Sequence, residues 1–567
     1  MSPAKKKTKR VTAETLSKRQ REISVSEFFA KNRHLLGFDS LRKSLLTTVK
    51  EAVDNSLDAC EEAGILPDIY VELESTGEEK RYRVTVRDNG PGIVPRQIPN
   101  IFGKLLYGSK FHSMKQSRGQ QGIGISAAAM YGQLTTGKPM HVISRTSKRK
   151  KAVSMQVMVD TTSNKPKTHQ EKELDEWDLD HGTQLTVELE AQYLKGKRSV
   201  DEFLFQVAVA NPHVALSYKN PSGELVVYER SVGENPEPAK EIKPHPHGVE
   251  LGVLMKMLQS TQQGSASRFL AKDFSRVSPQ LASSLLKRAG ISARARPKTI
   301  ARKEADDLYK AINDPATKIM APPTNCLSPI GSQQMLQGLL RGVDAEFYTV
   351  EGRKPSVYRG NPFQVEVGIA WGGDLPKDEL GRVLRFANRV PLLYQAGGCA
   401  ITKAVMDVGW KSYGLTQSRG ALPTGPLLVF VHLASVWVPF SSESKEAVAD
   451  YDEIRKEIKL ATQACGRRLG QFVRRKARAK NEAKRREIFN VYLEEVVAAV
   501  EGMTGEDQDG FREHLVGISR RKTELAELLE EAKTDQVSKG EIEDSENVLI
   551  IDRDDDAEPE QEGLSLG

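Results

Sequence analysis

The chain has 567 residues, of which 38% are hydrophobic and 28% are charged, values typical of a soluble globular protein with about three or four domains. Its formal net charge is only +7, and no apolar run reaches the length of about 18 residues that a membrane-spanning helix needs. The four cysteines lie far apart without a CxxC pair, which argues against a disulfide framework or zinc site and favours a reducing compartment. Because the sequence has no apolar run of that length, we expect no membrane partner.

The two ends of the chain carry charges of opposite sign. Residues 1–21 contain eight bases and one acid, whereas residues 541–562 contain eleven acids and one base. Such compositions bury too little apolar surface to fold alone. We therefore predict a basic disordered tail over 1–25 and an acidic disordered tail over 534–567.

Apolar periodicity and turn residues place the first elements. Apolar residues at three- and four-residue steps predict a helix over 41–60. Alternating residues predict strands over 82–86 and 184–189, and the first of these runs into the turn sequence 88–92. Prolines between 235 and 246 mark a domain boundary.

A helical block follows over 248–320. One helix is predicted after the N-cap residue Ser278, with a stop at Gly290. A second is predicted to begin at Pro297 and to end near Pro315.

The last third mixes strands and helices over 326–440, and then becomes helical. The pattern predicts one long helix from Tyr451 to Arg486, and further helix to about Lys533. Its segment 474–486 carries eight bases against one acid, which either contacts a phosphate backbone or forms a solvated helix face.

Glu51, Asn55 and Asp58 form the first candidate site. Steps of four and three residues place all three on one face of the predicted helix. A polar helix face alone more often indicates solvent exposure than function. Two glycine-rich segments downstream strengthen the case that these residues form a functional site.

The first glycine-rich segment is Asp88-Asn-Gly-Pro-Gly-Ile93, at a strand end. A carboxylate there can accept a hydrogen bond from an adenine amino group, and glycines allow the backbone to approach a flat base. The second is Arg118-Gly-Gln-Gln-Gly-Ile-Gly-Ile-Ser-Ala127, before a predicted helix start. Backbone amides at a helix N-terminus bind phosphate. Taken singly, the first segment is more often an ordinary turn and the second more often a flexible loop.

The segment Gly132–Lys138 matches most of a phosphate-binding P-loop. Pro139 stands where a Ser or Thr hydroxyl would bind magnesium, and proline prevents the helix that should begin there. We interpret this segment as a turn between elements.

The ordered set resembles the ATPase superfamily of gyrase, Hsp90, histidine kinases and MutL. This resemblance implies ATP and Mg²⁺ as cofactors, with Glu51 as general base, Asn55 as the magnesium ligand, Asp88 on adenine and Thr183 supporting that contact. The remaining residues implied to bind ATP in this part are Asp58, Gly90, Gly92, Gly119, Gln120, Gln121, Gly122, Ile123, Gly124, Ile125 and Ser126.

Three further segments resemble the topoisomerase VI B subunit family. Tyr107–Phe111 is similar to its lid segment, which implies that Ser109 and Lys110 face ATP. Arg268–Pro279 and the helices after it resemble its helix-two-turn-helix insert. Val438–Lys445 resembles its switch loop, which implies that the lysine is a catalytic residue that reaches the terminal phosphate.

The resemblance implies an α+β multidomain fold. It comprises a Bergerat-type α/β sandwich ATPase domain, a helix-two-turn-helix domain and an α/β transducer domain with a long C-terminal helix. The expected ranges are a tail over 1–25, ATPase over 26–236, helix-two-turn-helix over 240–325, transducer over 326–486, helices that dock an A subunit over 487–533, and a tail over 534–567.

The family's mechanism implies an A2B2 heterotetramer with a DNA-cleaving A subunit. ATP would close two copies of this chain through their ATPase domains around duplex DNA, and the A subunit would open another duplex. None of the fourteen tyrosines lies in a recognisable cleavage motif. The expected location is the cytoplasm with the nucleoid, or the nucleus in a eukaryote, for which the basic run 5–10 would be an import signal.

Two alternatives remain open. A MutL-like repair clamp or an Hsp90-like chaperone shares the ATPase residues, but lacks counterparts of the 248–320 block and of the segment 438–445. A DNA-binding scaffold without turnover would not need Glu51. That glutamate also favours hydrolysis over phosphate transfer of the histidine kinase type.

Overall fold

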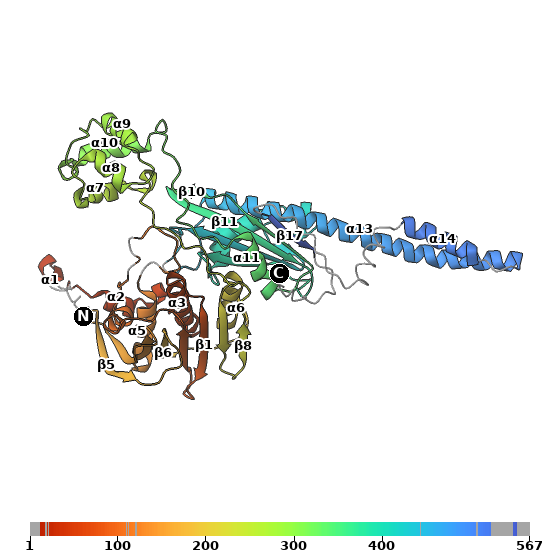
Figure 1. Cartoon of the computed structure of the whole chain (residues 1–567), viewed down its shortest axis with the longest axis horizontal. Helices are drawn as coiled ribbons and strands as arrows, with labels where there is room; N and C mark the ends of the chain where they lie inside the picture. Colours follow the sequence, from red (N-terminus) through yellow and green to blue (C-terminus); the bar gives the residue numbers. More distant parts are fainter. Residues whose placement is uncertain are drawn as a thin grey trace, which may run out of the picture.

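The structure is a computed structural model that describes residues 12–17, 20, 22–108, 110, 113–119, 122–442, 444–505, 509–522 and 548–552. Over these residues the chain forms two sheet-based parts, a separate helical part and a long projecting helix (Figure 1). No helix in the described ranges is long and apolar enough to cross a membrane.

The N-terminal part is built on a mixed eight-stranded sheet of order β5-β4-β3-β6-β2-β1-β7-β8. Its strands are β1 (Asp68–Ser75), β2 (Arg81–Asp88), β3 (Met140–Arg145), β4 (Ala152–Asp160), β5 (Lys165–Leu174), β6 (Gly182–Glu190), β7 (Ala215–Lys219) and β8 (Leu225–Tyr228). The strands predicted at 82–86 and 184–189 lie within β2 and β6, which pair antiparallel with Asp88 opposite Thr183. This register brings two predicted site residues together.

Helices pack on one face of this sheet (Figure 1). They are α2 (Val25–Lys31), α3 (Leu41–Glu62), α4 (Ile98–Gly103), α5 (Gly124–Thr136) and α6 (Val200–Ala210). The helix predicted over 41–60 is α3, and the side chain of Ser40 caps its N-terminus. Its apolar stripe, which includes Val49 and Leu57, is buried in the core. The opposite polar face is thereby left for the site.

The rejected P-loop segment 132–138 forms the last turn of α5 and the turn that follows. A Cβ on Gly132 would lie 2.7 Å from a methyl carbon of Val187, so α5 approaches β6 closely here. Gly137 ends the helix with a φ of +74°. The prediction of a turn is therefore wrong for 132–136, because packing against β6 keeps these residues helical.

The helical part contains α7 (Leu251–Ser260), α8 (Ala266–Asp273), α9 (Pro279–Arg288) and α10 (Arg302–Asn313). As predicted, Ser278 caps α9, and Gly290 follows its end with a φ of +70°. The helix predicted to begin at Pro297 begins instead at Arg302. Pro297–Thr299 form a separate 3-10 turn, and Glu304 caps the backbone at the true start.

The second sheet has the order β13-β12-β16-β11-β9-β17, with β10 beside β11. Its strands are β9 (Phe347–Gly352), β10 (Ser356–Tyr358), β11 (Asn361–Trp371), β12 (Arg382–Ala387), β13 (Val390–Pro391), β16 (Leu427–Ser435) and β17 (Val548–Asp552), while β14 (Thr416–Gln417) and β15 (Pro423–Thr424) form a separate pair. Helix α11 (Ser332–Gly342) covers one face, and α12 (Ala400–Met406) and α13 (Asp452–Thr504) cover the other.

The two sheet-based parts share an apolar cluster where α6 packs on α11. A Cβ on Gly338 would lie only 2.0 Å from the backbone oxygen of Val209, so the helices approach at backbone distance. Val209 and Ala210 pack with Leu339 and Phe430 of the second part. The two parts are therefore in direct contact through these helices.

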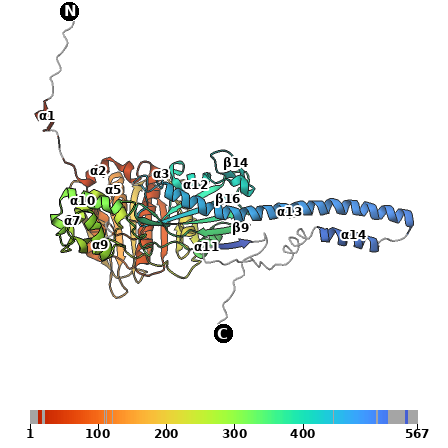
Figure 2. The same ribbon diagram turned by 90° about the horizontal axis from the view of Figure 1, so that it is seen from above.

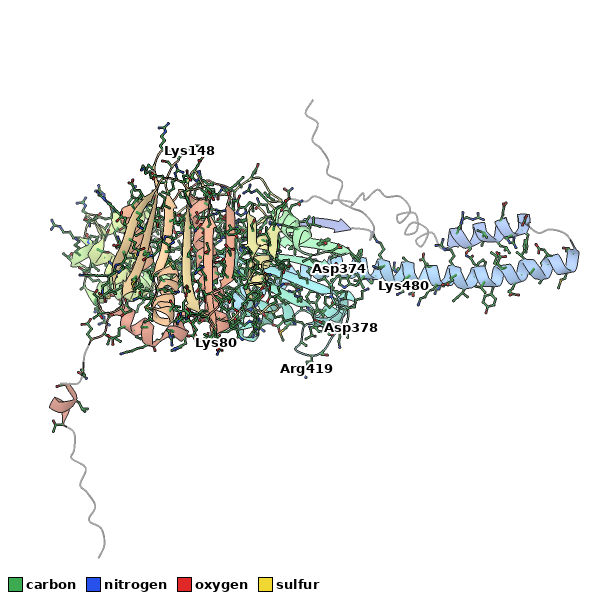
Figure 3. The ribbon with its side chains drawn as sticks, turned by 90° about the horizontal axis from the view of Figure 1, so that it is seen from below. Lys80, Lys148, Asp374, Asp378, Arg419 and Lys480 are labelled. Atoms are coloured by element: carbon green, nitrogen blue, oxygen red, sulfur yellow. The ribbon has the colours of Figure 1, made fainter. Side chains whose placement is uncertain are left out.

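Helix α13 projects far beyond the second sheet (Figure 2), and Lys480 lies on the projecting part (Figure 3). The prediction that this helix ends at Arg486 is wrong, because it continues to Thr504, and α14 (Asp509–Lys522) packs beside it. Buried Leu493 and Val497 explain the extension, because helix pairing covers their apolar surface. The helix predicted from 523 to 533 lies outside the described residues.

Two segments predicted to be disordered contain regular structure. α1 (Ala13–Ser17) forms within the predicted tail 1–25. Within the predicted tail 534–567, β17 pairs antiparallel with β9. Its apolar sequence Val548–Ile551 provides strand-forming residues, and the edge of β9 provides unpaired backbone groups. Short regular elements therefore occur within both predicted tails, and the other residues of 534–567 lie outside the described ranges.

Candidate functional site

The predicted site residues gather around one cavity of about 360 Å³, between α3, the glycine-rich segments and the loop that follows β16. Its wall contains, from the predicted set, Glu51, Asn55, Asp58, Asp88, Gly92, Lys110, Gly119, Gly122, Ile123, Gly124, Ile125, Thr183 and Lys445. Both sheet-based parts contribute residues to this wall, so the cavity lies at the junction between them.

Some predicted residues lie off the cavity wall or outside the described residues. Gly90 stands behind Asp88 and donates its backbone N–H to that carboxylate at 2.9 Å. The Ser126 hydroxyl is buried and donates to the backbone oxygen of Ile123 at 3.0 Å, so it faces its own helix rather than the cavity. Ser109, Gln120 and Gln121 lie outside the described residues.

One end of the cavity holds the carboxylate of Asp88 at the end of β2. It accepts hydrogen bonds from the Ser56 hydroxyl at 2.8 Å and from the backbone N–H groups of Gly90 and Thr183 at 2.9 and 3.2 Å. Burial raises the pKa of Asp88, and these hydrogen bonds oppose the shift. A carboxylate has about four acceptor positions, so one remains for a ligand donor such as an amino group.

The other end holds Glu51 and Asn55, one turn apart on α3. A Cβ on Gly124 would lie 1.6 Å from a carboxylate oxygen of Glu51, so only glycine permits this carboxylate at the N-terminus of α5. The unpaired amides of that helix end favour anions. Neither side chain makes a hydrogen bond within the described part of the chain, and both face the cavity. They therefore remain available to water, metal or phosphate.

The donor set at this end fits a magnesium ion bound mainly by phosphate and water. Asn55 supplies a hard amide oxygen, and Mg²⁺ takes few protein ligands when phosphates supply the rest. No group of three or more His, Cys, Asp or Glu side chains in the described ranges could hold a metal ion by itself.

Asp58 and Lys110 form the side of the cavity near residues 119–124 of the second glycine-rich segment, called the glycine-rich loop below. The Lys110 ammonium donates to Asp58 at 2.7 Å and lies 3.1 Å from Glu62. Burial opposes the charge of Lys110, but these carboxylates raise its pKa above the ordinary value. Gly119 donates its backbone N–H to Asp58 at 3.4 Å. Asp58 thus holds the residues that border the cavity rather than standing free within it.

Lys445 enters the cavity from the loop between β16 and α13. Its ammonium donates to the backbone oxygen of Arg118 at 3.2 Å. Burial lowers the pKa of Lys445, and the nearby charge of Glu51 opposes that shift. A half-buried cation whose acceptor among the described residues is one neutral oxygen is poised to gain from an anionic ligand.

Sequence comparisons agree with both halves of this architecture. Residues 41–192 match the family model described as histidine kinase-, DNA gyrase B-, and HSP90-like ATPase. Residues 322–485 match the model described as topoisomerase VI B subunit, transducer. The segment that contains Glu51 and the segment that contains Lys445 therefore fall in two different matched domains.

Comparison with individual relatives decides the family. The chain is 48% identical over 496 residues to the B subunit of type 2 DNA topoisomerase 6 from Methanosarcina acetivorans, covering 87% of this chain and 79% of that protein. The chain belongs to the family of type 2 DNA topoisomerase 6 B subunits. It is 51% identical to the Methanococcoides burtonii protein over 84% of this chain and 75% of that protein, and 38% identical to the Pyrococcus horikoshii protein over 91% and 98%.

The predicted family and the predicted α+β multidomain fold are thereby confirmed. So is the prediction that this topoisomerase 6 B-type chain is an ATP-dependent type II topoisomerase subunit with an ATP-binding domain. The alternatives of a repair clamp, a chaperone and a scaffold are not supported, because the match extends through the transducer.

Three polar residues at this topoisomerase site were missed by the sequence analysis. Lys43 of α3 forms an ion pair with Glu446, which joins the first part to the residue after Lys445. Burial raises the pKa of Asp54 to about 7, with the neighbouring charges modifying the shift. Lys43 lies about two helical turns before Glu51. Only tertiary packing reveals its partner on a distant loop.

Proposed function

We propose that this chain binds ATP with Mg²⁺ in the 360 Å³ cavity and hydrolyses it. Asp88 accepts from the adenine amino group, and Thr183 holds that carboxylate. The glycine-rich loop and the N-terminus of α5 bind the phosphates. Asn55 ligates magnesium, which neutralises phosphate charge when bound, and Lys445 contacts the terminal phosphate.

Glu51 orients the attacking water and accepts its proton in this proposal. The observation that carries it is the position of the carboxylate against Gly124, at the helix N-terminus and free of protein partners among the described residues. A phosphate held by that helix end would lie beside the carboxylate, and water between them would be in line for attack.

We further propose that ATP closes two copies of this chain around duplex DNA, within an A2B2 complex whose A subunit cleaves DNA. The projecting α13–α14 pair supports A-subunit docking, because Ile488, Val491, Tyr492 and Met503 on it are between 59% and 86% exposed. Large exposed apolar side chains in one region indicate a partner surface. The basic run 474–486 on the same helix supports a role beside DNA.

We place this activity in the cytoplasm with the nucleoid, or in the nucleus of a eukaryotic source, because its substrate is DNA. The domain ranges proposed from the sequence remain 26–236 for the ATPase, 240–325 for the helix-two-turn-helix domain and 326–486 for the transducer. The helices from 487 to 533 are the proposed docking element.

The test is ATP hydrolysis by the purified chain, alone, with duplex DNA, and with DNA and its A subunit. We expect turnover to rise with both additions, accompanied by ATP-dependent relaxation of supercoiled DNA. A rate of ATP hydrolysis that does not change when DNA and the A subunit are added would contradict the clamp mechanism. Failure to bind ATP would contradict the assignment of the cavity.

A further inference from the structure

Residues 116–118, directly before the glycine-rich loop, are held by the second sheet-based part. The backbone N–H of Gln116 donates to the backbone oxygen of Cys326 at 3.0 Å. The Gln116 side chain donates to the Ser328 oxygen at 2.9 Å and accepts from the Ser328 N–H at 2.7 Å. Three hydrogen bonds thus tie one residue of the ATPase part to the start of the transducer.

Ser117 is tied to the transducer sheet itself. Its backbone oxygen accepts from the side-chain amide of Asn388 at 3.0 Å. The same amide group also exchanges two hydrogen bonds of 2.9 Å with the backbone of Ser435, the last residue of β16. The loop with Lys445 begins after that strand, so Asn388 links the root of the glycine-rich loop to the root of the lysine loop.

Arg118 completes the connection within the ATPase part. Its buried guanidinium binds both oxygens of Glu61 at 2.6 and 2.7 Å and lies 3.1 Å from Asp58 and 2.7 Å from the Asn211 oxygen. Burial opposes ionisation of Glu61, but the charge of Arg118 holds the pKa of that carboxyl well below its usual range. The backbone oxygen of Arg118 meanwhile accepts from Lys445.

We propose that Gln116–Arg118 is a coupling segment that transmits the state of the glycine-rich loop to the transducer, with Asn388 as its positioning residue. This inference rests on the proposed ATP-driven function and adds a second connection beside Lys445. The loop that borders the cavity begins at Gly119, one residue after the segment. A shift of that loop onto phosphate therefore pulls on the adjoining backbone, which Asn388 holds at Ser117 and Ser328 holds through Gln116.

The proposed coupling depends on a difference in how firmly the two ends of the segment are held. Arg118 is fixed to α3 by a buried bidentate ion pair, which is costly to break. Its neighbours are fixed to the transducer by neutral hydrogen bonds, which exchange more readily. A signal between two states must change contacts that differ between those states. The segment contacts both parts, so a change at either part can reach the other through it.

Asn388→Ala and Gln116→Ala test the inference in the complete complex with the A subunit. Both remove transducer-side contacts and leave the cavity wall unchanged. We expect ATP affinity and DNA-free ATP hydrolysis to stay within about twofold of wild type, whereas strand-passage events per ATP hydrolysed fall about tenfold. Asn313→Ala is the matched control, because this exposed asparagine of α10 bonds, among the described residues, to Tyr309 of its own helix.

Unchanged strand passage per ATP in both variants would overturn the inference. So would an equal loss of ATP binding and strand passage in a folded variant, because this would indicate a nucleotide-binding role instead. Thermal melting identifies an unfolded variant, and the second variant then decides. Failure of the wild-type complex to couple ATP to strand passage would instead contradict the proposed function.

Discussion

The two ends of the cavity differ in how completely the protein has satisfied their polar groups. At the Asp88 end, a serine hydroxyl and two backbone N–H groups already fix the carboxylate. At the Glu51 end, carboxylate and amide face the cavity, and within the described part of the chain Lys445 donates to a single backbone oxygen. A rigid end suits recognition of an invariant base, whereas an incompletely paired end suits groups whose contacts change during a reaction.

The largest effect should come from Glu51→Ala. We expect ATP binding to persist and hydrolysis to fall by about 100- to 10,000-fold, the range for loss of a general base. Steady-state turnover together with binding of a fluorescent ATP analogue measures both. Glu72→Ala, on β1 and paired with Lys219 away from the cavity, should retain normal turnover. Normal turnover in the Glu51→Ala variant would exclude Glu51 as the general base.

Lys445→Met should lower the turnover number by about 100-fold, the loss typical of one group that stabilises transition-state charge. ATP affinity should change less, because the adenine end is untouched. A matched Lys411→Met variant, with an exposed lysine on the short helix before β14, is the control. If affinity falls and the turnover number does not, the lysine contributes only to ground-state binding.

Asp88→Asn tests the opposite end. It should weaken ATP binding by about 10- to 100-fold, because a charged acceptor contributes about 1.5–3 kcal/mol to a hydrogen bond. The turnover number at saturating ATP should change little. Calorimetric titration with ATP and with GTP measures the contrast, and unchanged selection between the two bases would remove Asp88 from adenine recognition.

The smallest effect concerns stability near the Glu51 end. Burial raises the folded-state pKa of Asp54 to about 7, above its ordinary value of 3.8. Between these two values the folded state binds more protons than the unfolded state, so this group reduces stability as pH rises from about 4 to 7. Asp54→Asn should therefore be stabilising at pH 8 and much less so at pH 4.

Urea unfolding of both proteins at pH 4, 6 and 8 would measure this difference. One pKa unit corresponds to about 1.4 kcal/mol, so the gain at pH 8 is at most on the order of 4 kcal/mol. Asp378→Asn, on a loop of the second part seen at its surface (Figure 3), is the control. A gain that does not depend on pH would contradict a titrating Asp54.

The sequence analysis located thirteen residues of the cavity wall but not the electrostatic network around it. The helix face of Glu51, Asn55 and Asp58 and the Asp88–Thr183 pair follow from local patterns and from the resemblance to known ATPases. No local pattern pairs the buried arginine before the glycine-rich loop with a carboxylate of α3, or the lysine near the start of α3 with the residue after Lys445. Those partners come from different elements, and a lone charge in a sequence is ordinarily a solvated one.

What the sequence by itself determined is local in origin: the buried stripe of α3, the strand ends, the glycine-rich segment before the start of α5, and the caps of α9. Helix and strand periodicity and glycine conformations act within a few residues. Only the tertiary structure decided that Lys445 meets Arg118, 327 positions away, and that β17 pairs with β9. These contacts depend on how α6 packs against α11 and on an edge strand left open, and packing between distant segments has no local sequence pattern.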